Sequence, residues 1–157
     1  MANGSLKAIT DERVREFLRL ARIAHLGTTS GDGAPHNIPL CFWFDGALRF
    51  YFAIDEKPKR LSGTGLKRMR NISENPRVAL IVDHYEEDWS QLAYVLVHGD
   101  AQVIDDPTEY MFALRNLRDK YAQYRAMVLN PDRNPIVRID IERIHVWGAR
   151  FNGPGAS

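Results

Sequence analysis

The sequence contains a single cysteine, Cys41, among 157 residues, so it has no intramolecular disulfide and no cysteine-based metal cage. Such sparse cysteine usage favours a reducing compartment, and we expect a cytoplasmic protein. No apolar run approaches the roughly 20 residues that a membrane span needs, and the first residues lack the apolar core of a signal peptide. The formal net charge is only +1. We therefore expect neither a membrane nor nucleic acid as a partner.

Signatures of metal and nucleophilic chemistry are also missing. The five histidines show no H-x-x-x-H spacing and none lies beside the cysteine, so we predict no metal site. The sequence has no G-x-S-x-G motif and no local Ser/His/Asp or Cys/His pattern. Cys41 lies in an apolar strand and is expected to fill the core. No catalytic residue is assigned.

Apolar periodicity and turn residues predict one domain over residues 1–157, with loose ends at 1–9 and 151–157. The predicted helices begin at Thr10, at Leu66 and at Asp106, where Pro107 and Glu109 complete a capping signal. The predicted strands cover residues 25–29, 37–44, 47–54, 77–85, 93–103 and 136–146. Since strands and helices do not alternate as in a parallel sheet, we predict a mainly β protein, a six-stranded antiparallel barrel with flanking helices.

Two strands carry unusual apolar patterns. In residues 37–44, Leu40, Phe42 and Phe44 occupy one face while Cys41 and Trp43 occupy the other. A strand that is apolar on both faces indicates a barrel wrapped by a helix or a partner. In the last strand the apolar phase changes after residue 141, which predicts a β-bulge near residues 142–143.

A basic segment over residues 57–70 carries six cations and no acid. It crosses a glycine-containing loop and enters the helix at Leu66, where backbone N–H groups and the helix dipole favour an anion. We interpret it as a phosphate site, with a solvated basic loop as the alternative. The acidic run of residues 86–88 and the near-neutral net charge argue against a nucleic-acid surface.

Aromatic and cationic residues also end the last strand, at Trp147 and Arg150. Together they can stack on a planar anionic ring and pin it, but a barrel-closing Trp beside a surface Arg explains the pattern equally well. His36 likewise either faces a ligand or belongs to a turn.

Several segments together resemble a known family. They are AHLGTTSGDGAPHNIPLCFWFDG, YFAIDEKPKR, LKRMRNISENPRVALIVDHYEEDW, YVLVHGDAQV and HVWGAR. In these segments the chain resembles the pyridoxamine 5′-phosphate oxidase-like superfamily of flavin-binding split barrels, and within it the group of enzymes that depend on the deazaflavin coenzyme F420. The resemblance extends from Val14 to Trp147.

The resemblance implies a six-stranded split barrel (PNPOx-like, an FMN-binding split barrel) that forms a homodimer with cofactor sites at the subunit interface. It places the backbone of residues 37–40 along the ring system, Lys67 and Arg68 on the phosphate, and Tyr94 and Trp147 on the ring. The full candidate cofactor-binding set is His36, Asn37, Ile38, Pro39, Leu40, Phe52, Lys57, Lys59, Arg60, Lys67, Arg68, Tyr94, Trp147 and Arg150.

The chain also departs from true pyridoxamine phosphate oxidases. It lacks their basic R-x-V-L-L-K stretch and their long C-terminal W…R-L-x-x-R tail. The extra cations at 57–60 suit F420, with its phosphodiester and glutamyl tail, better than FMN. We therefore expect an F420H2-dependent reductase that passes a hydride to a small unsaturated or quinone-like acceptor, with Tyr94 or His36 as candidate proton donors. The alternatives are an FMN-dependent oxidase or reductase and a non-catalytic flavin- or haem-binding protein.

Overall fold

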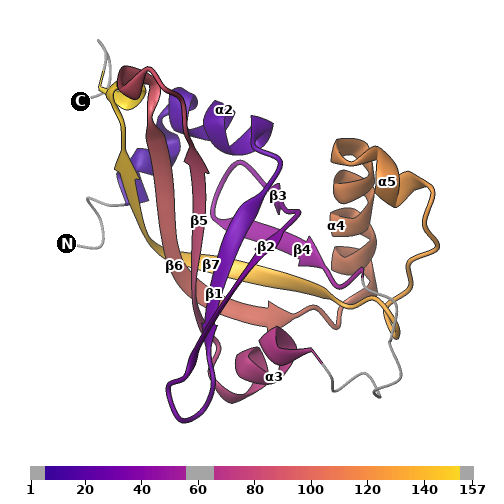
Figure 1. Cartoon of the computed structure of the whole chain (residues 1–157). Helices are drawn as coiled ribbons and strands as arrows, with labels where there is room; N and C mark the ends of the chain where they lie inside the picture. Colours follow the sequence, from indigo (N-terminus) through magenta and orange to yellow (C-terminus); the bar gives the residue numbers. More distant parts are fainter. Residues whose placement is uncertain (1–5, 56–65, 153–157) are drawn as a thin grey trace.

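The computed structural model describes residues 6–55 and 66–152. One antiparallel sheet curls into a half-barrel, with its strands in the order β2-β1-β5-β6-β7-β4-β3 (Figure 1). The strands are β1 (Ala24–Thr29), β2 (Pro35–Leu40), β3 (Trp43–Phe44), β4 (Arg49–Ala53), β5 (Arg77–His84), β6 (Ala93–Val103) and β7 (Ile136–Trp147). The α-helices are α2 (Glu12–Leu20), α3 (Lys67–Glu74), α4 (Pro107–Lys120) and α5 (Ala122–Arg125). Short 3-10 helices are η1 (Lys7–Thr10), η2 (Trp89–Gln91) and η3 (Ala149–Phe151). The predicted antiparallel barrel with flanking helices is confirmed.

The predicted strand over residues 37–44 is two strands, so the described sheet has seven strands rather than six. β2 pairs with β1, whereas β3 pairs with β4 at the opposite edge of the sheet. At the break, the Phe42 N–H donates to the Tyr121 hydroxyl at 3.0 Å rather than to a neighbouring strand. The hydrophobic pattern does not predict this break, because every residue from Ile38 to Phe44 is apolar.

The predicted β-bulge is confirmed in β7. His98 lies opposite Arg143 but Gly99 lies opposite Ile141, which leaves Glu142 as the extra residue. The two strands approach so closely here that a Cβ atom on Gly99 would lie 2.2 Å from the carbonyl oxygen of Asp140. Only glycine fits this position without a backbone shift.

The inner face of the half-barrel holds the larger core, which α2 and α3 close. Val14, Phe17 and Leu18 of α2 and Ile72 of α3 belong to the same buried cluster as the inward side chains of the strands. α2 begins later than predicted, since Asp11 rather than Thr10 caps it by accepting a bond from the Arg13 N–H at 2.9 Å.

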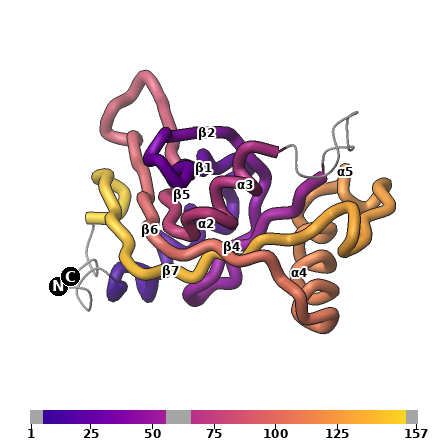
Figure 2. Tube along the Cα trace, turned by 90° about the horizontal axis from the view of Figure 1, so that it is seen from below, coloured from indigo at the N-terminus to yellow at the C-terminus, as the bar shows by residue number. Residues whose placement is uncertain are grey.

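The outer face is covered at one end by α4 and α5, which stand beside β4 and β7 in both views (Figures 1 and 2). Phe50 and Phe52 of β4 point to the inner core, while Tyr51 and Ala53 belong to a second cluster with α4. Cys41 and Trp43 pack against that second cluster, and Phe42 and Phe44 belong to the inner core. Of the two predicted ways to cover this apolar strand, a helix or a partner, the structure shows a helix, α4.

The start of α4 agrees with its capping signal, because Asp106 accepts a bond from the Thr108 N–H at 3.0 Å and Pro107 follows at the first position. The Glu109 carboxylate instead binds Arg138 at 2.7 Å, on the sheet. The helix ends at Lys120, and Val128, which lies beyond it, is 91% exposed.

Candidate functional site

The β1–β2 hairpin divides the predicted ring-binding stretch between two faces. Asn37 and Pro39 lie opposite Gly27 and His25 on the outer face of the sheet. His36, Ile38 and Leu40 point the other way, and Ile38 and Leu40 pack against the inner core. A ligand on the outer face can therefore touch the side chains of Asn37 and Pro39 and the backbone of the whole stretch.

α3 is tied to this hairpin by three hydrogen bonds. The Asn71 amide donates to the Thr28 hydroxyl at 2.9 Å, and the Asn75 amide donates to the Thr29 hydroxyl at 2.8 Å. In the turn that follows β1, the Gly31 N–H donates to a Glu74 carboxylate oxygen at 2.7 Å. These bonds hold the basic helix alongside β1 and β2.

The start of α3 suits an anion. Leu66 is the N-cap residue and has no polar side chain to bond the first N–H groups, and the first turn contains no acid. The Lys67 side chain is exposed there, while Arg68 is buried, with 8% of its surface accessible. The Ser30 hydroxyl and, to a smaller extent, the Lys67 ammonium lower the pKa of Asp32 in the neighbouring turn. Of the predicted phosphate pair, Lys67 is the residue open to a ligand.

Two buried polar atoms near the hairpin lack a hydrogen-bond partner within residues 6–55 and 66–152. They are His36 Nδ1 and Asn71 Oδ1. Both residues neighbour Thr28, since His36 lies opposite it in the ladder and the Asn71 amide donates to its hydroxyl. Buried polar atoms are normally paired, so a bound group or an ordered water would be stabilised here. Lys67 and the first N–H groups of α3 thus fit an anionic group at the hairpin, whereas Asn71 Oδ1 is an acceptor and needs a donor.

An aromatic platform lies on the outer face at the other side of the sheet. Tyr94 and Trp147 face each other across β6 and β7 and stack, with ring centroids 5.6 Å apart and an interplanar angle of 18°. Trp147 is 48% exposed, and His145 lies 5.9 Å from the Tyr94 ring. The exposed Trp147 surface can receive a planar ring.

The hairpin and the aromatic platform are too far apart in one protomer to grip the same ring. Tyr94 on β6 is three strands from β2 and Trp147 on β7 is four. At about 4.8 Å between strands, these separations are about 14 and 19 Å. One chain therefore presents two half-sites on a single face rather than a complete pocket.

Sequence reasoning did not anticipate the residues that lie between the two half-sites. Pro39, His25, Ile81, Leu96 and His145 form one row across the outer face, each opposite the next. His25 Nδ1 is 3.8 Å from an Asp83 carboxylate oxygen. In the next row, burial and the Arg143 charge lower the pKa of His98. The row could not be predicted without the strand order, because β1 pairs with β5, whose residues are more than fifty positions further along the chain.

Two of the predicted residues lie elsewhere. Phe52 is 1% exposed in the inner core, so it presents no side chain to the outer face. The Arg150 guanidinium lies 5.5 Å above the Phe17 ring and lines a small groove with Glu12 and Glu16 of α2. The Arg150 guanidinium therefore faces α2. The predicted residues Lys57, Lys59 and Arg60 lie outside the described residues.

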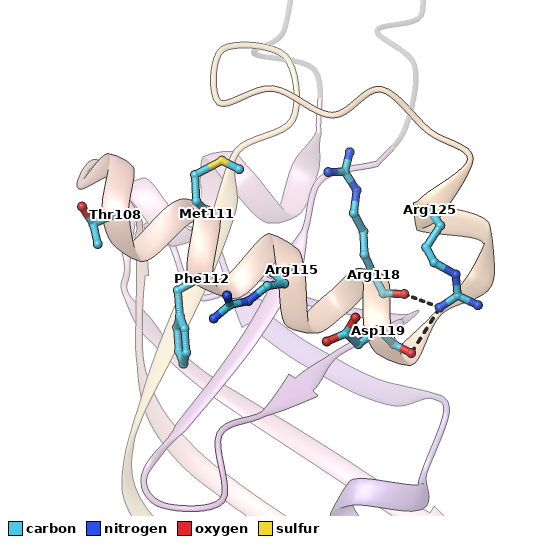
Figure 3. Close-up of a pocket in the computed structure, with 7 residues that line it drawn as sticks. All are labelled: Thr108, Met111, Phe112, Arg115, Arg118, Asp119 and Arg125. Atoms are coloured by element: carbon cyan, nitrogen blue, oxygen red, sulfur yellow. Dashed lines mark hydrogen bonds between the residues drawn. The ribbon is translucent and has the colours of Figure 1, made fainter.

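A groove of about 860 Å³ lies on α4 (Figure 3). Thr108, Met111, Phe112 and Arg115 line it along the helix, and Arg125 donates to the carbonyl oxygens that end the helix. It contains none of the predicted cofactor-binding residues. Within residues 6–55 and 66–152, no cluster of metal-binding side chains is present and no helix is long and apolar enough to cross a membrane.

Comparison with known proteins identifies the family to which this fold belongs. A family model described as pyridoxamine 5′-phosphate oxidase matches residues 10–148. The chain belongs to this family. It therefore has the fold of the flavin-binding split barrels, as the resemblance of its segments predicted.

Among curated relatives, the chain is 31% identical over 94 residues to a 5a,11a-dehydrotetracycline/5a,11a-dehydrooxytetracycline reductase from Streptomyces rimosus. The match covers 56% of this chain and 59% of that reductase, so the chain spans less than two thirds of its length.

Solved structures share the fold at lower identity. A conserved hypothetical protein from Mycobacterium tuberculosis aligns with a TM-score of 0.71 and 18% identity, over 94% of this chain and 91% of that one. A heme binding protein from Mycobacterium smegmatis reaches 0.71 with 17% identity over 94% and 55% of the two chains. An FAD-binding protein from Mesorhizobium loti reaches 0.62 with 20% identity over 83% and 88%.

Proposed function

We propose that this protein is an F420H2-dependent reductase that acts as a homodimer, with two cofactor sites between the subunits. One observation carries the proposal: the outer face of the sheet presents the β1–β2 hairpin at one side and, about 14–19 Å away, an aromatic platform, while α3, on the inner face, brings an anion-binding helix start to the same hairpin. A partner packed on this face by two-fold symmetry would place the platform of one subunit over the hairpin of the other.

The composition of the outer face favours a second copy of this chain as the partner that packs on it. Over β1, β5 and β6 the described helices leave it without cover, although Ile81, Leu96 and Tyr94 lie on it. These side chains are half-buried rather than fully exposed. An apolar row at the centre with histidines and Asp83 around it matches the anatomy of a subunit interface.

In this arrangement the protein binds and orients the cofactor. Lys67 and the first N–H groups of α3 would hold the phosphodiester, the backbone of residues 37–40 would contact the ring, and Trp147 of the other subunit would cover it. F420H2 supplies the hydride when it is bound, and the acceptor gains a proton with it. Covering the ring with an aromatic side chain keeps water from the reacting carbon.

The choice of F420 rests on charge and on the relative that is a reductase. The cations of the 57–70 segment suit the phosphodiester and glutamyl tail of F420, and the Streptomyces rimosus relative is named a reductase. The match covers only 59% of that protein, so reductase activity in this chain is part of the proposal.

The cofactor is tested by titrating the protein with F420 and FMN and recording the absorption of the protein as purified. A single near-violet band and tighter F420 binding are expected. Tighter FMN binding would replace F420 by FMN in the proposal, and a Soret band would favour haem and reject a reductase. Lys67→Ala should weaken F420 binding about tenfold, because it removes one charged contact. Lys7→Ala, on exposed η1, is the matched control.

The dimer is tested by sedimentation. Leu96→Arg places a charge at the centre of the outer face and should convert a dimer to a monomer that no longer binds F420. Val128→Arg, at a residue that is 91% exposed, should leave the dimer intact. A wild-type monomer with full cofactor affinity would rule out sites shared between subunits.

A further inference from the structure

The β1–β2 ladder ends where the two strands separate. Its last pair is Ala24 and Leu40. In the same antiparallel register, the pair two residues further on would be Arg22 and Phe42. These two residues do not continue the ladder, because the chain leaves β2 there and two residues later enters β3, which pairs with β4.

The Tyr121 hydroxyl lies between these two residues. It accepts a hydrogen bond from the Phe42 N–H at 3.0 Å. It donates its own proton to the Arg22 carbonyl oxygen, at 2.8 Å, or to the Phe42 carbonyl oxygen, at 3.0 Å. One phenol thus takes the place of the hydrogen bonds that the next ladder pair would make. It comes from the end of α4, nearly eighty residues further along the chain.

The surroundings of Tyr121 fix the hydroxyl in this gap. The Tyr121 N–H donates to the Leu117 carbonyl at 2.9 Å and so ends α4. The Arg22 guanidinium lies 5.7 Å from the Tyr121 ring and donates to the Lys120 carbonyl. The Lys120 ammonium lies 3.9 Å from the Phe42 ring. Burial raises the pKa of Tyr121 to about 12, so the hydroxyl keeps its proton at neutral pH.

We propose that Tyr121 is a positioning residue for the cofactor site: its hydroxyl sets the point where β2 leaves β1 and so holds the stretch Asn37–Leu40 in the path needed to bind the ring. Phe42 is only two residues from Leu40. Without the hydroxyl, the Phe42 N–H loses its acceptor and the end of β2 is free to slide or fray. The part that concerns cofactor binding rests on the proposed function.

The test compares Tyr121→Phe with Tyr110→Phe. Tyr110 lies in α4 and Tyr121 directly follows it, and both hydroxyls bond backbone carbonyls, but the Tyr110 hydroxyl donates to the Asn134 carbonyl oxygen at 2.8 Å, in the loop before β7. Both variants should melt at lower temperature. Only Tyr121→Phe should weaken cofactor binding, by about tenfold, and shift the absorption band of the bound cofactor. Equal loss of affinity in both variants, or none in Tyr121→Phe, overturns the proposal.

Hydrogen exchange tests the positioning without any cofactor. In the wild type, the Phe42 amide should be protected to the same degree as the amides of β2, although it lies outside the ladder. In Tyr121→Phe, exchange should rise at Phe42 and along residues 37–40, and Tyr110→Phe should leave both unchanged. A freely exchanging Phe42 amide in the wild type overturns the proposal even where the variant does not fold. A wild type that binds no F420 but shows this exchange pattern rejects the proposed function and retains the role of Tyr121.

Discussion

Replacing Gly99 by alanine tests the close approach of β6 and β7 at the bulge. The added Cβ would lie 2.2 Å from the Asp140 carbonyl oxygen, and an ordinary contact begins near 3.4 Å, so β6 and β7 must separate by about 1 Å. The obstacle is backbone rather than a flexible side chain, and the shift falls at the bulge that both strands share. Overpacking of this kind costs about 3 kcal/mol. For a domain of this size, that lowers the melting temperature by about 6–12 °C.

The control for Gly99→Ala is Gly27→Ala in β1. Its Cβ would lie 3.6 Å from the Ala79 carbonyl oxygen, which is ordinary contact, so stability should be unchanged or rise by about 0.5 kcal/mol. Urea unfolding followed by circular dichroism measures both variants. If the two variants unfold at the same urea concentration, β6 and β7 are not as close at Gly99 as the structure places them.

Three further substitutions probe the polar groups and the site. Glu109→Gln removes the carboxylate that binds Arg138, and urea unfolding should show a loss of about 1–2 kcal/mol; no loss would show that this pair is not formed. Burial lowers the pKa of Lys120 from 10.5 to about 8, so from pH 8 to 10.5 the unfolded chain binds the proton more tightly. Wild-type stability should therefore rise with pH in that window relative to Lys120→Met, and a constant difference would contradict the burial of the amine. Trp147→Ala should weaken F420 binding measured by fluorescence while Arg150→Ala should not, and the reverse result would place the ring on the α2 side.

Local signals in the sequence predicted the elements whose partners are close along the chain. Asp106 and Pro107 begin α4 as their residue types require, because capping depends on the next few residues alone. The bulge at Glu142 was visible because it changes which residues of one strand are apolar. Both features follow from sequence positions and need no knowledge of which strands are neighbours.

Other features depend on contacts between distant segments, and the sequence carries no mark of them. The break between β2 and β3 lies in an unbroken apolar run, and the group that makes it possible is the hydroxyl of Tyr121, which the helical pattern treats as an apolar position. Arg150 is three residues from Trp147 in the sequence, but it lies in η3 and its guanidinium packs over Phe17 of α2, a contact between distant segments. For the candidate site, the sequence predicted which strands and helices carry the residues, but it did not predict which face of the sheet each side chain occupies.

β4 separates the two hydrophobic clusters and contributes to both, with Phe50 and Phe52 on one side and Tyr51 and Ala53 on the other. If β4 detached from the sheet, both clusters would be exposed to water. The barrel interior and the α4 layer should therefore melt in a single cooperative transition, in which calorimetric and van't Hoff enthalpies agree. A protease that cuts after local opening of α4 would then find the whole barrel unfolded rather than a trimmed core.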